Sequence, residues 1–108
     1  MDKEQKSLQF WDIAQPLLLT GKAEKGTMMG FPCLRVHGKF CASLEKDSGD
    51  LIVKLPATRV QELIASGEAV PFAPNGRIFR EWALLTDDDA ACWEGYLQEA
   101  IAFVGGNS

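Results

Sequence analysis

The 108-residue chain has little of what metal, redox and hydrolytic sites are built from, since it contains three cysteines and one histidine. The cysteines are odd in number and show no CxxC or other regular spacing, which argues against a disulfide framework and indicates free thiols in a reducing compartment. The sequence also lacks a phosphate-binding loop, a dinucleotide-binding glycine pattern and a metal-protease motif. We therefore expect no enzyme, no metal and no other cofactor.

Long apolar runs are missing as well. No stretch approaches the roughly 20 apolar residues that a membrane span needs. The first residues, MDKEQKSLQFWD, are polar and amphipathic where a signal peptide would be apolar. We expect a cytoplasmic protein that does not enter a membrane. Its length, with 46% apolar and 24% charged residues, predicts one domain over residues 1–108.

Basic residues are absent from the C-terminal end of the chain. Residues 86–108 carry five acids and no base, residues 31–85 carry six acids and seven bases, and residues 1–30 carry four of each. The formal net charge is −4. Because duplex-binding proteins neutralise phosphates with a basic face, this balance disfavours nucleic acid as a partner, although it leaves room for a local basic patch.

The first predicted helix runs over residues 3–19. Asp2 is suited to cap it together with Gln5, an apolar stripe keeps helical spacing, and Gly21 is expected to end it. Pro16 lies in the interior, where a proline removes an amide donor and clashes with the preceding turn. We expect a kink or a break there.

The segment LRVHGKFCASL predicts a β-hairpin with His37-Gly38 as its two-residue loop. In this register Leu34 pairs with Cys41 and Cys33 pairs with Ala42, so the sheet separates the two sulfur atoms. A zinc site needs its thiolates and imidazole to converge on one point. We therefore interpret the two cysteines as buried apolar residues and the histidine as a solvent-exposed turn residue.

The remaining elements follow from turn signals and apolar spacing. After the hairpin we expect a strand over 51–55, a helix opened by Pro56 and ended by Gly67, a short proline-bearing edge segment, a Pro-Asn-Gly turn, a long strand over 77–85 and a last helix capped by Thr86. The order α, three strands, α, two strands, α indicates the α+β class, with a mainly antiparallel sheet covered by helices.

Three consecutive acids, Asp87, Asp88 and Asp89, resemble a divalent-ion site in composition. Consecutive helical residues point about 100° apart, however, so their carboxylates would diverge. We interpret them as acids of the first turn of the last helix, where the helix dipole favours negative charge.

The strand expected over residues 77–85 offers a candidate binding surface. Alternation divides its side chains between two faces, with Ile78, Arg80 and Trp82 on one and Arg77, Phe79 and Glu81 on the other. Arginine and tryptophan are over-represented among the energetic anchors of protein interfaces. The alternative is that Trp82 belongs to the core and Arg80 covers it, or that an arginine pairs with Glu81 or with an aspartate of the last helix.

Arg35, Lys39 and Lys54 predict a modest basic patch on the sheet. Because Glu45, Asp47 and Asp50 are close in sequence, a solvated mixed-charge face is the alternative. The candidate partner-binding residues are therefore Arg35, Lys39, Arg77, Arg80 and Trp82.

Several segments resemble the N-terminal domain family of the bacterial TfoX/Sxy competence regulators, namely KGTMMGFPCLRVHGKFCASL, LIVKLPATRVQELIASG, PFAPNGRIFREWALL and WEGYLQEAIAFV. The resemblance covers nearly the whole chain, and its most specific pieces are GTMMG, LRVHGKFCA and the KLP strand-helix unit. It implies a secretion-chaperone-like fold, shared with YjbR-type proteins, and brings no established catalytic residues. Longer relatives continue into a second, helical domain beyond the point where this chain stops.

Together these observations predict a non-enzymatic interaction module that binds a protein partner or pairs with itself. A regulatory nucleic-acid-binding protein is the alternative, which the family resemblance suggests and the net charge opposes. A small-ligand pocket or an unrecognised enzyme is the third hypothesis.

Overall fold

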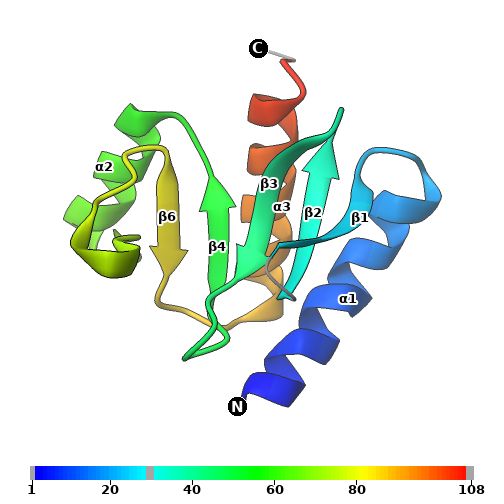
Figure 1. Cartoon of the computed structure of the whole chain (residues 1–108), viewed down its shortest axis with the longest axis horizontal. Coiled ribbons are helices and arrows are strands. Elements are labelled where there is room, and N and C mark those ends of the chain that lie inside the picture. Colours follow the sequence, from blue (N-terminus) through cyan, green and yellow to red (C-terminus); the bar gives the residue numbers. More distant parts are fainter. Residues whose placement is uncertain (1, 29–30, 107–108) are drawn as a thin grey trace.

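The computed structural model describes residues 2–28 and 31–106. Its elements are, in chain order, α1 (Lys3–Leu19), β1 (Glu24–Met28), β2 (Phe31–Val36), β3 (Lys39–Leu44), β4 (Leu51–Lys54), α2 (Ala57–Ser66), β5 (Ala69–Pro71), the 3-10 turn η1 (Pro74–Gly76), β6 (Trp82–Leu85) and α3 (Ala90–Val104). The strands of this described part form one antiparallel sheet in the order β1-β2-β3-β4-β6-β5. Figure 1 labels β1 to β4 and β6 in this order. The α+β class and the antiparallel pairing are thus confirmed.

One face of the sheet builds the hydrophobic core. Val53, Ala83 and Leu85 project from this face and join a single buried cluster with side chains of all three helices, among them Phe10 and Trp93. The opposite face, which we call the open face, therefore has no described helix packed against it. Strand register places one row of residues across it, Gly26, Cys33, Ser43, Ile52, Leu84 and Val70.

Helix α1 begins as its sequence predicts. The Asp2 carboxylate accepts a hydrogen bond from the Gln5 amide at 2.8 Å, and the Gln5 side chain accepts one from the Asp2 amide at 3.0 Å. The helix continues through Pro16 to Leu19, so the expectation of a break is wrong. Ala14 and Leu17 are both buried in the core, and their packing holds the turn that carries the proline.

The β2–β3 hairpin has the predicted loop and a different register. His37 and Gly38 have φ values of 53° and 80°, the left-handed conformations that a tight hairpin loop requires. Beyond the first two pairs a β-bulge intervenes, so that Leu34 pairs with Ala42 and Cys33 pairs with Ser43. The predicted pairs Leu34–Cys41 and Cys33–Ala42 are therefore wrong, because a bulge inserts one extra residue, here Cys41, into β3.

The sheet has one strand more than expected before α2. Strand β1 pairs with β2 and forms an edge of the sheet. Its sequence, EKGTM, has neither a clean apolar alternation nor β-branched enrichment, so only pairing with β2 makes it a strand. Residues 29 and 30 of the GTMMG segment lie outside the described residues.

Strand β6 is shorter than predicted, since it begins at Trp82 and residues 77–81 form a loop. Both neighbouring strands end at this level. The Leu55 amide donates to the Glu81 carbonyl at 2.9 Å. The next residue, Pro56, has no amide hydrogen to continue the hydrogen bonding between β4 and β6. On the other side Pro71 lacks the same donor. The predicted face alternation of Arg77 to Glu81 is consequently wrong.

Helix α3 also begins later than predicted. Asp89, and not Thr86, is its N-cap, accepting hydrogen bonds from the amides of Ala91 and Cys92. The Thr86 hydroxyl donates instead to the carbonyls of Gly67 and Glu68, each at 3.2 Å. Asp87 to Asp89 hence precede the helix and do not form its first turn.

Candidate interaction surface

Apolar side chains collect on the open face around β5, β6 and the loop that joins them. We call this group the open-face cluster: Val70, Phe72, Phe79, Trp82 and Leu84. Ile78 precedes Phe79 in the joining loop. Ile78 is 60% exposed, Val70 41% and Phe79 38%. Large apolar side chains gathered on one exposed surface are typical of sites where another molecule binds.

The aromatic members of the cluster pack on one another. The rings of Phe72 and Phe79 are stacked with centroids 6.0 Å apart, and Phe72 lies 6.5 Å from Trp82. Trp82 is half-buried, and the Lys54 ammonium lies 5.5 Å from its ring centroid. Trp82 thus belongs to the open face, as its strand neighbour Leu84 does, and the alternative that placed it in the core beneath the helices is wrong.

A hollow of about 820 Å³ adjoins the cluster. We call it the open-face hollow. Ile52, Phe72 and Leu84 provide its apolar lining, residues 71–75 form one wall, and residues 45–47 of the β3–β4 turn form the other. The second wall carries two carboxylates, those of Glu45 and Asp47.

Arg77 and Arg80 are exposed in the loop that precedes β6. The Arg77 guanidinium lies 5.8 Å from the Phe79 ring centroid. Among the described residues neither arginine has a carboxylate within 4.0 Å, whereas Glu81 pairs with Lys54 at 3.8 Å. The predicted pairing of these arginines with Glu81 or with an aspartate near α3 is therefore not observed in the described chain.

Arg35 and Lys39 lie on the other half of the sheet. The Arg35 guanidinium lies 4.6 Å from the Phe40 ring centroid, and its Nη2 donates to the Thr27 carbonyl at 3.5 Å. Its Nε is buried without a hydrogen-bond partner. Lys39 is exposed and lines, with Phe40, Lys54 and Trp82, a second hollow of about 530 Å³. The five predicted residues thus form two groups that meet near Trp82.

The cysteines and the histidine do not converge. Cys41 is part of the helix-side core cluster, Cys33 is buried in the open-face row, and His37 is exposed at the hairpin tip. Burial raises the pKa of Cys41 to about 12. Burial also raises the pKa of Cys33, although Arg35 opposes this shift. No group of three or more His, Cys, Asp and Glu side chains suited to a metal occurs within residues 2–28 and 31–106.

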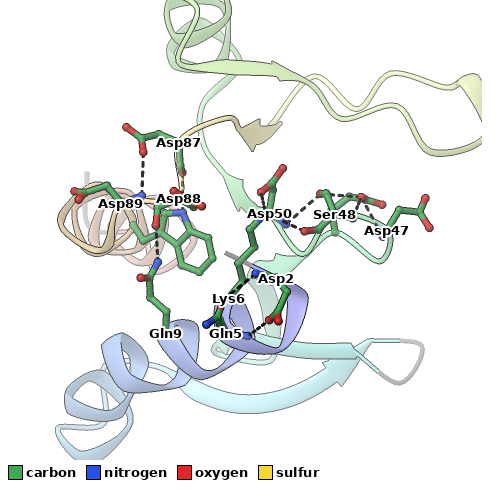
Figure 2. A network of polar contacts seen from close by, with 12 residues as sticks. Asp2, Gln5, Lys6, Gln9, Asp47, Ser48, Asp50, Asp87, Asp88 and Asp89 are labelled. Carbon is green, nitrogen blue, oxygen red and sulfur yellow. Dashed lines mark hydrogen bonds and ion pairs between the residues drawn. The ribbon is translucent and has the colours of Figure 1, made fainter.

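Asp50, after the β3–β4 turn, and Asp88, before α3, both contact side chains of α1, as Figure 2 shows. The Lys6 ammonium donates to Asp50 Oδ1 at 2.6 Å and to the Ser48 carbonyl at 3.0 Å. The Gln9 side chain donates to the Asp88 carbonyl at 2.7 Å. These residues attach the N-terminal half of α1 to the β3–β4 turn and to the start of α3.

The comparisons with known proteins found no matching family model, no matching curated protein and no matching solved structure. In the described parts of the chain, no helix has the length and apolar character that crossing a membrane requires.

Of the residues at this candidate surface, Arg77, Arg80 and Trp82 were predicted from the sequence, and Val70 and Phe72 were not. The missed residues lie in VPFAPNGRIF, where apolar residues alternate with proline and glycine. Turn-forming segments usually carry polar side chains, so apolar residues concentrated in one were the available signal.

Proposed function

We propose that this chain is a non-enzymatic interaction module that binds a protein partner or a second copy of itself through the open face. The observation that carries the proposal is the open-face cluster, which exposes Val70 and Phe79. The adjoining loop exposes Ile78 and two arginines without carboxylate partners in the described chain. Arginine and aromatic side chains are enriched among interface anchors.

The chemistry of the thiols and the imidazole supports a binding role over catalysis. A nucleophilic cysteine needs a lowered thiol pKa and a base within reach. Here burial raises the pKa of both Cys33 and Cys41, and His37 lies at the exposed hairpin tip. The resemblance to the TfoX/Sxy N-terminal domain family, which has no established catalytic residues, agrees with this proposal. Three free thiols agree with a cytoplasmic location, which we include in it.

Selection of random peptides displayed on phage against the immobilised chain tests the module. We expect enriched peptides to bind the native chain and to lose at least about 10-fold in affinity to Ile78→Asp, because a charge would replace an exposed apolar anchor. Leu8→Asp is the matched control, since Leu8 is 62% exposed on α1, away from the cluster. Peptides that bind both variants equally would show that binding occurs elsewhere.

Binding of nucleic acid in a regulatory role is the second candidate function. Its specific support is that three cations lie over aromatic rings at the sheet, Arg35 over Phe40, Lys54 over Trp82 and Arg77 over Phe79. Aromatic rings beside cations are typical of single-strand binding surfaces. The net charge of −4 opposes this function.

Fluorescence anisotropy of labelled duplex and single-stranded DNA, titrated with the chain at low salt, tests this alternative. If it holds, the logarithm of the association constant falls linearly with the logarithm of salt concentration, and binding weakens further in Arg77→Ala/Arg80→Ala. Unchanged anisotropy at about 50 mM salt, where phosphate contacts are strongest, would refute it.

A further inference from the structure

We propose that the open-face hollow receives the loop Arg77–Arg80 of a second copy of this chain, so that two copies pair about a twofold axis. This inference rests on the proposed function and names its partner. We call residues 77–80 the tip.

The tip has the character of an anchor. Ile78 is 60% exposed, more than Val70 or Phe79 of the neighbouring open-face cluster. Arg77 and Arg80 flank it, and neither has a carboxylate within 4.0 Å among the described residues. A protruding aliphatic side chain between two positive charges requires an apolar site with acidic groups at its rim.

The hollow has this complementary character. Its volume of about 820 Å³ exceeds that of an isoleucine side chain, and Ile52, Phe72 and Leu84 line it. On its far wall stand Glu45 and Asp47, with one opposing charge from Lys46 between them. The Glu45 carboxylate accepts hydrogen bonds from the Ser48 amide at 2.8 Å and the Asp47 amide at 3.1 Å, which fixes this wall.

Tip and hollow are neighbours on one chain. The wall formed by residues 71–75 leads directly into the tip, so a chain cannot place its own tip in the hollow beside it. A twofold axis between the two features places each tip in the partner's hollow and each arginine pair near the partner's acidic wall. Such reciprocal contact is what an isologous dimer requires.

Strand addition at the sheet edge is less suited to this partner. Strand β5 is the edge strand beside the cluster, and it is three residues long and ends in Pro71. A proline at an edge removes an amide donor and discourages pairing with another strand. Contact through side chains of the face is therefore favoured. Because the net charge of −4 makes two copies repel each other, we expect a micromolar and not a nanomolar dissociation constant.

Sedimentation equilibrium of the full chain over a range of concentrations tests the pairing. We expect the mass to rise from 11.9 kDa towards twice that value. Ile78→Asp should raise the dimer dissociation constant at least about 30-fold, as loss of an interface anchor does. Leu19→Asp, which alters a side chain 79% exposed on α1, should leave it unchanged.

Charge reversal adds a test that a folding defect cannot imitate. Arg77→Glu/Arg80→Glu places acids opposite the partner's acidic wall, and Asp47→Arg places a base opposite the partner's arginines, so each variant alone should be monomeric. An equimolar mixture should form a heterodimer, because both of its contacts then join opposite charges.

A chain that stays monomeric at every concentration overturns the inference, as does a dimer that Ile78→Asp leaves intact or a mixture that shows no heterodimer. The proposed function is judged separately by peptide selection. If the chain is monomeric and the selected peptides depend on Ile78, the proposed function holds and the hollow binds another protein. If the chain is monomeric and no peptide is enriched, both the pairing and the proposed function are refuted. Dimer dissociation by single-stranded DNA would favour the nucleic-acid alternative for this face.

Discussion

Replacing Lys6 by methionine should destabilise the chain more than any other single surface charge change that we consider. The Lys6 and Asp50 side chains are 12% and 25% exposed, and Nζ lies 2.6 Å from Oδ1. Nζ also donates to the Ser48 carbonyl at 3.0 Å. The variant keeps the aliphatic stem and leaves the Asp50 carboxylate without its cation.

The expected magnitude lies between two limits. Removing one partner of a fully buried ion pair costs about 3–5 kcal/mol, and an exposed pair contributes about 0–1 kcal/mol. Because Asp50 retains a quarter of its exposure, solvent screens the orphaned charge in part, and we expect a loss of about 2 kcal/mol. With a urea m-value of about 1–2 kcal/mol/M, the unfolding midpoint should fall by roughly 1–2 M.

Urea unfolding followed by tryptophan fluorescence measures this loss, since Trp93 is fully buried in the native chain. Lys22→Met is the matched control, because Lys22 is exposed and should change stability by less than about 0.5 kcal/mol. The double variant Lys6→Met/Asp50→Asn should lose less than the sum of the two single losses, since it leaves no buried charge. Equal midpoints for the Lys6 and Lys22 variants, or strict additivity in the double variant, would refute the reasoning.

Three further outcomes follow from the structure. Titration of Tyr96, the single tyrosine, by absorbance should give a pKa of about 12, because burial and the hydrogen bond to Glu68 raise it. The pKa of Tyr96 in the folded chain exceeds the unfolded value of about 10. The stability contributed by the protonated Tyr96 hydroxyl is therefore complete below pH 10 and is lost as pH rises towards 12. A titration of native Tyr96 near pH 10 would contradict this pKa shift. A thiol reagent at pH 8 should modify one cysteine quickly, the exposed Cys92, with the two buried thiols reacting only on unfolding, and rapid modification of all three would contradict the burial. Gly38→Ala should cost about 1 kcal/mol in thermal or urea unfolding, because no atom lies within 4 Å of the added Cβ and the cost comes from its φ of +80° alone; an unchanged midpoint would contradict this.

Local signals in the sequence determined the elements whose cause lies within a few residues. The Asp2–Gln5 capping box, the His37-Gly38 loop and the Gly67 end of α2, with φ at 84°, each depend on the chemistry of residues next to them. The α+β class and the antiparallel pairing also followed, because short loops between strands permit little else.

Only the tertiary structure decided the features that depend on distant neighbours. Strand β1 exists because β2 offers it hydrogen bonds, and β6 begins at Trp82 because the adjacent strands end at Lys54 and Pro71. The bulge at Cys41 changed the pairing, since a single inserted residue alters every partner beyond it. The sequence likewise predicted only part of the candidate surface. Arginine and tryptophan were recognisable by residue type, whereas the hollow arises where two turns that are far apart in sequence meet across the sheet.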